Sequence, residues 1–220
     1  MGQFQKHGYK IVRSFIDPSL RNIIEDYTLY KSKTSGLRQN YEPDFIPHSL
    51  TFYGDNLTES LLKSFLPKME EITELSLVPT YSFLRLYKGG DRLPKHKDRL
   101  SCQIAVSLCI AYSYDHNEYR WPFILEGKEI DLKPCDALIY RGSDIIHWRN
   151  KFERKEEEWH LQMFFFYIDT TAEFAKDLAY DARPELGLTK DSAKIDIREY
   201  EHEYFTSRGF VYAGRATYHD

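Results

Sequence analysis

The chain has 220 residues, of which 42% are hydrophobic and 15% aromatic, and its 30 basic and 34 acidic residues give a formal net charge of −4. This length suits one sizeable core. The near balance of interspersed charges argues against a general nucleic-acid or membrane-surface binder, and no apolar run reaches the roughly 18 residues of a membrane-spanning helix.

The N-terminus and the cysteines indicate an intracellular protein. Residues 1–6 lack the apolar segment that directs secretion. Cys102, Cys109 and Cys135 are an odd number at unrelated spacings, which fits reduced core thiols better than a disulfide framework or a zinc site. We therefore expect a cytoplasmic protein that binds neither nucleic acid nor a membrane. Its oligomeric state stays open.

Helical patterns come first along the chain. Asp17 followed by Pro18 is typical of a helix start, and apolar residues then recur at helical spacing, with Gly36 as the expected end. A second helical pattern covers 61–75 and is interrupted near Pro67. We expect these helices to support a core that lies further along the chain.

From Tyr81 the pattern changes to short apolar runs bounded by Gly, Pro and Asp, which is typical of a β-sandwich or barrel. The step Glu126-Gly127-Lys128 predicts a hairpin turn. The predicted strands are Tyr81–Tyr87, Gln103–Ala111, Pro122–Leu125, Glu129–Leu132, Ala137–Tyr140, Ile145–Trp148 and His160–Ile168.

The predicted organisation is a single domain, 1–220, of mainly β structure with flanking α-helices. Residues 1–80 form helical support with edge strands, 81–169 form the core, and 170–220 form a C-terminal extension. Within the extension we expect a short helix capped by Thr171 and carrying Phe174 and Leu178. The extension could cover the barrel, cap the site or pack on a second copy, and the sequence does not choose among these.

A His-x-Asp pattern is the strongest candidate for chemistry. In an extended strand residues i and i+2 point to the same side, so His96 and Asp98 can bind one metal ion. His147, far along the chain, is the candidate third ligand, and two imidazoles with one carboxylate can hold one face of a ferrous ion. The alternative is a surface pair at His96 and Asp98 with His147 in the core. The similar pattern at 116–118 lies in a polar segment and is interpreted as a solvated loop.

Three segments in order resemble the Fe(II)/2-oxoglutarate-dependent dioxygenases, particularly the prolyl-4-hydroxylase-like branch. They are Tyr87-Lys88-Gly89-Gly90, then His96-Lys97-Asp98, then Pro134-Cys135-Asp136-Ala137-Leu138 leading to His147. The resemblance covers roughly 81–169. It implies a double-stranded β-helix (jelly-roll) core, Fe(II) held by His96, Asp98 and His147, and 2-oxoglutarate as cosubstrate, with ascorbate as a candidate reductant.

The resemblance also implies a group that binds the distal carboxylate of 2-oxoglutarate. Glu158 falls where the family carries a cation, and a carboxylate there would repel the cosubstrate. The remaining candidates are Tyr87, which matches a family tyrosine, Arg149, which shares a strand face with His147, and His160 with Gln162, which alternate with Glu158.

The expected activity is therefore that of a dioxygenase, most simply a hydroxylase, which releases succinate and CO2 while oxidising a C–H bond of a peptide (prolyl) or small-molecule substrate. Two alternatives remain. One is a non-catalytic jelly-roll binding protein, and the other is a cupin-type mononuclear metal enzyme that does not use 2-oxoglutarate. A zinc hydrolase ranks lower, because the sequence has no His-Glu-x-x-His helix and no thiolate cluster.

Overall fold

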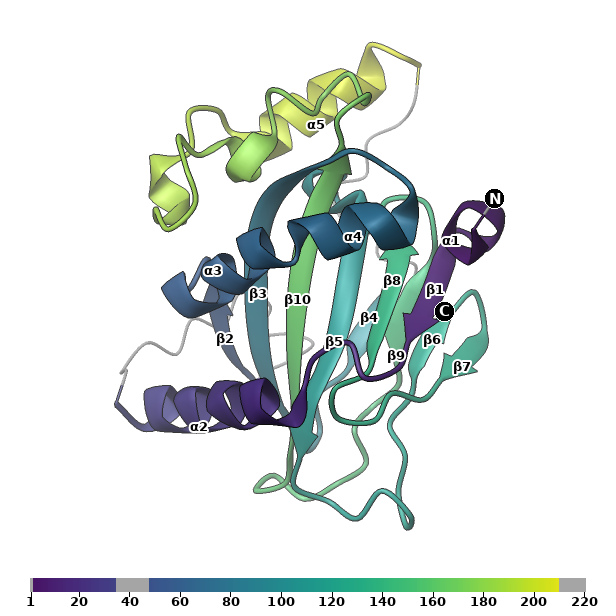
Figure 1. Cartoon of the computed structure of the whole chain (residues 1–220), viewed down its shortest axis with the longest axis vertical. Helices are drawn as coiled ribbons and strands as arrows, with labels where there is room; N and C mark the ends of the chain where they lie inside the picture. The colour runs from purple at the N-terminus through teal and green to yellow at the C-terminus, as the bar shows by residue number, and fades with distance from the viewer. Residues whose placement is uncertain (1, 35–47, 210–220) are drawn as a thin grey trace.

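The computed structural model describes residues 2–34 and 48–209, and two antiparallel β-sheets form its centre (Figure 1). The larger sheet has the strand order β1-β8-β5-β10-β3-β2 and the smaller one β4-β9-β6-β7. The strands of the larger sheet are β1 (Tyr9–Val12), β2 (Leu50–Tyr53), β3 (Leu77–Lys88), β5 (Ile104–Tyr112), β8 (Ala137–Arg141) and β10 (Trp159–Asp169). Those of the smaller sheet are β4 (Leu93–His96), β6 (Phe123–Leu125), β7 (Lys128–Ile130) and β9 (His147–Arg149).

Side chains alternate between two cores on the strands of the larger sheet. In β10, Leu161, Met163 and Phe165 pack on the helix side, whereas Phe164 and Phe166 face the smaller sheet. The inner core joins both sheets, since residues of β6 and β7 pack with those of β3, β5 and β8. All the predicted strands are present, and this two-sheet arrangement is the mainly β fold class that the sequence predicted.

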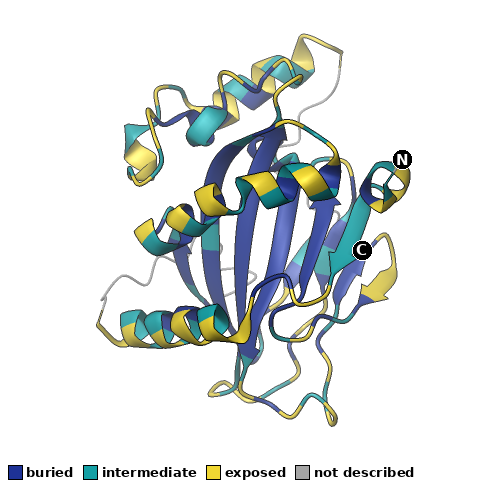
Figure 2. Ribbon diagram, in the orientation of Figure 1, coloured by how far each residue is buried: buried dark blue, intermediate teal, exposed yellow. Residues whose placement is uncertain are grey.

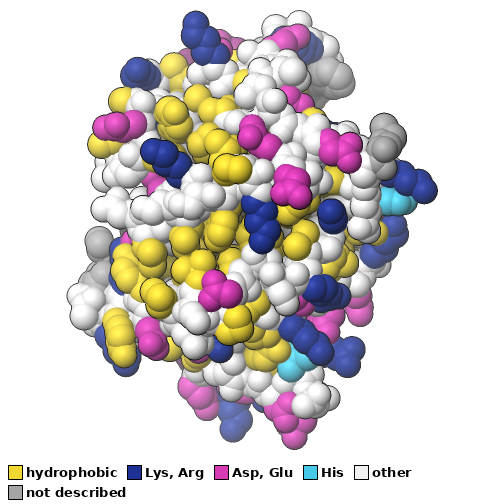
Figure 3. Space-filling view, in the orientation of Figure 1, with side chains coloured by type: hydrophobic (Ala, Val, Ile, Leu, Met, Phe, Trp, Pro, Cys, Tyr) yellow, Lys and Arg dark blue, Asp and Glu magenta, His cyan; other side chains and the backbone are white. Residues whose placement is uncertain are grey.

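Helices cover the outer face of the larger sheet, and their inward sides are buried (Figure 2). They are α2 (Pro18–Thr34), α3 (Asn56–Ser64) and α4 (Leu66–Thr73), while α1 (Gln3–His7) precedes β1. Over this face, basic and acidic side chains lie intermixed, with hydrophobic ones between them (Figure 3). No helix within 2–34 or 48–209 has the length and hydrophobicity needed to cross a bilayer.

Local chemistry explains the elements that were predicted correctly. Oδ1 of Asp17 accepts hydrogen bonds from the backbone N–H groups of Ser19 and Leu20, as a cap does, and Pro18 opens α2. The expected end at Gly36 lies outside the described residues. The predicted hairpin joins β6 to β7, where Glu126 and Gly127 both have positive φ, the conformation that two-residue hairpin turns require.

The C-terminal extension corrects one prediction. Residues 170–178 form turns rather than the predicted helix, and 3₁₀ turns follow at Ala179–Ala182 and Lys190–Ser192. Phe174 and Leu178 are nevertheless buried, because their spacing also suits tight turns against the core. A helix that was not predicted, α5 (Ile197–Thr206), lies further on; its Ile197 is buried, and Tyr200, Tyr204 and Phe205 pack against the same cluster.

Candidate metal centre

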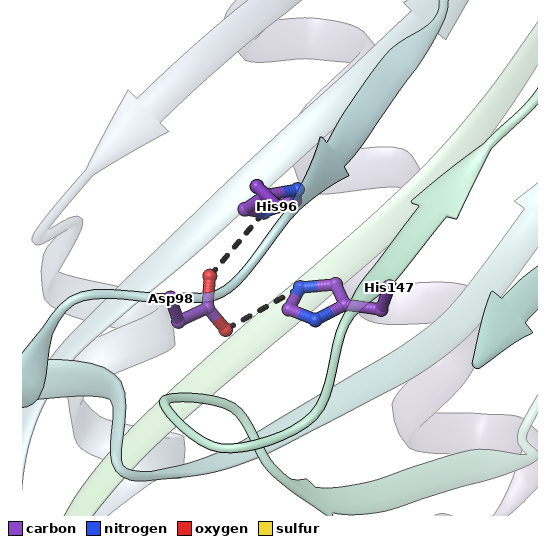
Figure 4. Close-up of side chains that lie close together, drawn as sticks. All are labelled: His96, Asp98 and His147. Carbon is purple, nitrogen blue, oxygen red and sulfur yellow. Dashed lines mark ion pairs between the residues drawn. The ribbon is translucent and has the colours of Figure 1, made fainter. Parts of the chain in front are cut away.

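His96 and His147 lie directly opposite each other on neighbouring strands. His96 ends β4, His147 begins β9, and the antiparallel register pairs the two residues, so that their ring centroids are 4.2 Å apart. Asp98 follows β4 and turns its carboxylate toward both rings (Figure 4). Nε2 of His96 lies 3.4 Å from Oδ1 of Asp98, and Nε2 of His147 lies 3.5 Å from Oδ2. The structure thus brings together the three side chains that the sequence singled out as candidate ligands.

Backbone carbonyls set the tautomer of both imidazoles. Nδ1–H of His96 donates to the carbonyl of Pro94 at 2.8 Å, and Nδ1–H of His147 donates to the carbonyl of Ile145 at 2.9 Å. Each ring therefore has the lone pair of Nε2 available on the side that faces Asp98. Such a hydrogen bond on the far nitrogen is what orients histidines that bind a metal.

Burial and charge both act on this group of residues. His147 is buried, and burial lowers its imidazole pKa, which favours the neutral, ligand form. Burial by itself would raise the pKa of Asp98, but His147 and His96 hold it below its usual range when the Nε2 atoms that face the carboxylate carry a proton. A metal ion at the same position would favour the ionised carboxylate in the same way.

The donor set fits a divalent metal ion. The candidate ligand atoms of His96, Asp98 and His147 all lie within 4.8 Å of one another. Oδ2 of Asp98 is buried and has no hydrogen-bond partner of normal geometry among the described residues, an arrangement that costs free energy unless a cation satisfies it. No other group of three such residues was found within 2–34 and 48–209.

Arg149 supplies a buried positive charge on the same strand face as His147. Its side chain is 2% exposed, and Nη1 donates to the carbonyl of Trp121 at 2.5 Å. The guanidinium lies over the ring of Trp121, 4.7 Å from its centroid. Within the described chain no carboxylate pairs with Arg149, and its Nε has no hydrogen-bond partner. A buried cation without an anion is costly, so this position favours an anionic ligand.

Tyr87 is fully buried and lies near this cation. Its ring packs edge-on against Trp121 at 4.9 Å, and its hydroxyl accepts a hydrogen bond from Nη1 of Arg85 at 3.3 Å. Burial lowers the pKa of Arg149, and the nearby Tyr87 acts in the opposite direction. Arg85 and Arg149 thus place two guanidinium groups close to one tyrosine.

His160 and Gln162 form a neutral hydrogen-bonded chain in the inner core. The hydroxyl of Tyr114 donates to Nδ1 of His160, Nε2–H of His160 donates to Oε1 of Gln162, and Nε2 of Gln162 donates to Oγ of Ser107, each at 2.8 Å. Burial and the charge of Arg149 hold the pKa of His160 well below its usual range. The neutral imidazole has both nitrogens occupied, so Arg149 is the stronger candidate for binding a carboxylate.

Two other residues of the sequence analysis lie apart from this site. Glu158 precedes β10, and its Oε1 accepts a hydrogen bond from Nη2 of Arg154 at 2.6 Å, so it is engaged by a cation of its own. His116 pairs with Asp131 rather than with Glu118, at 2.9 Å between Nε2 and Oδ2.

Sequence reasoning missed two residues at the site. The ring of Tyr140 packs edge-on against His147, and its hydroxyl lies 3.4 Å from Nε2 of that histidine. Alternation along the predicted strand Ala137–Tyr140 could have placed it on the inner face. Gly142 lies against Asp98 and donates its backbone N–H to the carbonyl of Gln103. No local pattern in a single sequence predicts such a contact.

Comparison with solved structures identifies the fold. A prolyl-4-hydroxylase from Pseudomonas putida superimposes with a TM-score of 0.54 at 13% identity, covering 75% of this chain and 95% of that one. HygX from Streptomyces hygroscopicus, with nickel, 2-oxoglutarate and hygromycin B bound, gives 0.57 at 10% identity, covering 76% and 85%. The α-ketoglutarate-dependent epimerase SnoN of nogalamycin biosynthesis gives 0.61 at 10% identity, covering 88% and 93%.

These likenesses confirm, at the level of the fold, the resemblance predicted from three short segments: the chain has the jelly-roll fold of the iron- and 2-oxoglutarate-dependent oxygenases. No protein-family model and no curated protein matches the sequence.

Proposed function

We propose that this chain is an Fe(II)- and 2-oxoglutarate-dependent dioxygenase, most simply a hydroxylase. The observation that carries the proposal is the convergence of His96, Asp98 and His147 on one point. On the same strand face lies the buried Arg149, which has no carboxylate partner among the described residues. The fold shared with the prolyl-4-hydroxylase and HygX supports it.

His96, Asp98 and His147 would hold the metal, which with 2-oxoglutarate supplies the oxidation of an unactivated C–H bond. The carbonyls of Pro94 and Ile145 keep the two imidazoles in the ligand tautomer. Phe123 stacks on the ring of His147 at 5.3 Å and limits its rotation. The protein thus contributes a preorganised set of donors and leaves the oxidative step to the cosubstrate.

Arg149 would bind the distal carboxylate of 2-oxoglutarate, with Tyr87 as a second donor. Two residues along a strand span about 6–7 Å, which suits a five-carbon diacid that reaches from the metal ligands to the guanidinium. The rings of Trp121 and Phe123 lie against the buried guanidinium of Arg149, and these apolar surroundings strengthen its attraction for a carboxylate.

The substrate is proposed to be a peptide or a small molecule, and the protein is proposed to be cytoplasmic. The solved structures with the same fold point to different classes of substrate, since one is a prolyl-4-hydroxylase and another has hygromycin B bound. Cys102, Cys109 and Cys135 are all buried free thiols, in agreement with a reducing compartment.

Succinate formation tests the proposal directly. Purified protein with Fe(II), ascorbate and 2-oxoglutarate should release succinate slowly without any added substrate. His96→Ala and Asp98→Ala should abolish this turnover, while His116→Ala, which removes the other His-x-carboxylate histidine, should retain it. Unchanged turnover in His96→Ala would overturn the assignment.

Two further results would favour the alternatives. Absence of 2-oxoglutarate binding at millimolar concentration, measured by calorimetry with a redox-inert divalent metal, would favour a binding protein. Oxygen consumption that does not depend on 2-oxoglutarate would favour a cupin-type enzyme.

A further inference from the structure

We propose that the C-terminal extension, residues 170–209, belongs to the metal centre: Asp181 and Glu201 hold the loop after β4 and thereby orient Asp98. This inference rests on the proposed function, because it assumes that Asp98 binds a metal. The extension follows β10 directly and lies beyond one end of the larger sheet (Figure 1).

The first contact is made to Arg99, the residue that follows Asp98. Nη2 of Arg99 lies 2.8 Å from Oδ2 of Asp181, whose side chain is completely buried. The hydroxyl of Tyr53 donates to the same oxygen at 2.5 Å, and the guanidinium of Arg99 lies over the ring of Tyr81. The side chain of Arg99 is therefore held between the extension and β3.

The second contact is made to the next residue, Leu100. Its backbone N–H donates to Oε1 of Glu201 in α5 at 2.7 Å, and Glu201 is only 3% exposed. The side chain of Leu100 packs among Phe174, Leu178 and Ile197, all from the extension. Two consecutive residues after Asp98 are thus bound by groups about 80 to 100 positions away in sequence.

These contacts matter because the carboxylate of Asp98 has little support of its own. Its backbone N–H donates to the carbonyl of Gly142 at 2.9 Å, but Oδ2 makes no hydrogen bond of normal geometry among the described residues. The direction of the carboxylate must then come from the backbone on either side. β4 fixes the side before Asp98, and the extension fixes the side after it.

Backbone strain in the extension also indicates that Asp181 is held in place on Arg99. Tyr180, Asp181 and Ala182 have φ of 53°, 60° and 59°, a left-handed run of three non-glycine residues. The Cβ atom of a non-glycine residue disfavours this conformation, so strong contacts must hold the turn. Arg183 anchors it through buried hydrogen bonds to Glu59 and to the carbonyl of Thr80. The result of this strained geometry is the placement of Asp181 on Arg99.

Metal binding and metal-free stability, measured together, test the inference. We expect Glu201→Ala and Asp181→Asn to weaken Co(II) binding by about tenfold to a hundredfold, as loss of outer-shell support typically does, and to alter the visible Co(II) spectrum. Glu201→Gln keeps an oxygen that can accept from Leu100 and should restore most of the affinity. Tyr167→Phe is the stability control, because it removes one buried hydrogen bond, to the carbonyl of Leu62, on the helix side of the sheet.

The outcomes separate this inference from the proposed function. Tyr167→Phe should lower the unfolding temperature of the metal-free protein and leave Co(II) affinity and spectrum unchanged. Wild-type affinity in both Glu201→Ala and Asp181→Asn, with normal Co(II) binding by the wild type, would overturn this inference alone. Absence of Co(II) binding by the wild type would overturn the metal site and this inference together.

Discussion

A Cβ atom placed on Gly142 would lie 2.5 Å from Oδ2 of Asp98, and it would also overlap the carbonyl oxygen of Cys102. Gly142 lies between β8 and β9 and receives the backbone N–H of Asp98 on its own carbonyl. Any side chain at this position must therefore displace the carboxylate or the loop that carries it. The absence of a side chain at 142 is what allows Asp98 to face the two histidines.

We predict that Gly142→Ala weakens Co(II) or Ni(II) binding by at least about tenfold and destabilises the metal-free protein by about 1–3 kcal/mol, as overpacking usually does. Calorimetric titration and denaturant unfolding measure the two effects. Ser143→Ala changes the next residue of the same turn without approaching Asp98 and should leave both quantities near wild type. Equal metal affinity in the two variants would contradict this account of Gly142.

Metal should stabilise the fold. A divalent ion present at a hundredfold excess over its Kd stabilises the native state by about 2.7 kcal/mol, which for a chain of this size corresponds to a rise of about 5–10 °C in the unfolding temperature. Thermal scans with Mn(II) and with a chelator measure the shift. His96→Ala should eliminate it and His116→Ala should keep it, and a persistent shift in His96→Ala would place the metal elsewhere.

Arg149→Met should separate ligand binding from stability. The loss of charge-assisted hydrogen bonds to a carboxylate should weaken 2-oxoglutarate binding by about tenfold to a hundredfold. The metal-free protein should lose little or no stability, because the change removes a buried cation that has no carboxylate partner among the described residues. Calorimetry with 2-oxoglutarate and Mn(II), together with denaturant unfolding, measures both. A variant that binds 2-oxoglutarate as the wild type does would exclude Arg149 as the anchor.

His160 should make the protein less stable as the pH falls. Below about pH 6.5 the imidazole of an unfolded chain takes up a proton, whereas burial beside Arg149 holds the pKa of the folded His160 well below that value. The unfolded state then binds more protons, so the free energy of unfolding should decrease by up to about 1.4 kcal/mol for each pH unit below 6.5. The effect should be absent above this pH.

Comparison with His160→Gln isolates this contribution, since glutamine does not titrate. Denaturant unfolding between pH 7 and pH 5 should show a smaller decrease in stability for the variant than for the wild type. His147 is also buried with a lowered pKa and remains in both proteins, so it does not affect the difference. Parallel pH profiles would contradict this account, because they would show that His160 takes up its proton over the same pH range in the folded and the unfolded state.

Elements set by short-range chemistry were predictable from sequence. The start of α2 depends on the Asp17 cap with Pro18, and the β6–β7 turn depends on two residues with positive φ. Elements set by distant packing were not. The segment from Thr171 has helical spacing but forms turns, and α5 was not predicted although Ile197 packs in the cluster of the extension and Glu201 reaches the loop after β4.

For the site, sequence determined which residue types stand at His96, Asp98 and His147, and the two-residue period placed the first two on one side of a strand. That period follows from backbone geometry and needs no neighbours. Only the tertiary structure decided that β4 and β9 pair in the register that sets His96 against His147, and that Arg149 is buried with no carboxylate partner in the described part of the chain. It also decided that Gly142 lies against Asp98 and that the C-terminal extension contacts the two residues after it. Burial and desolvation arise from segments far apart in the chain, and so they exist only once the chain has folded.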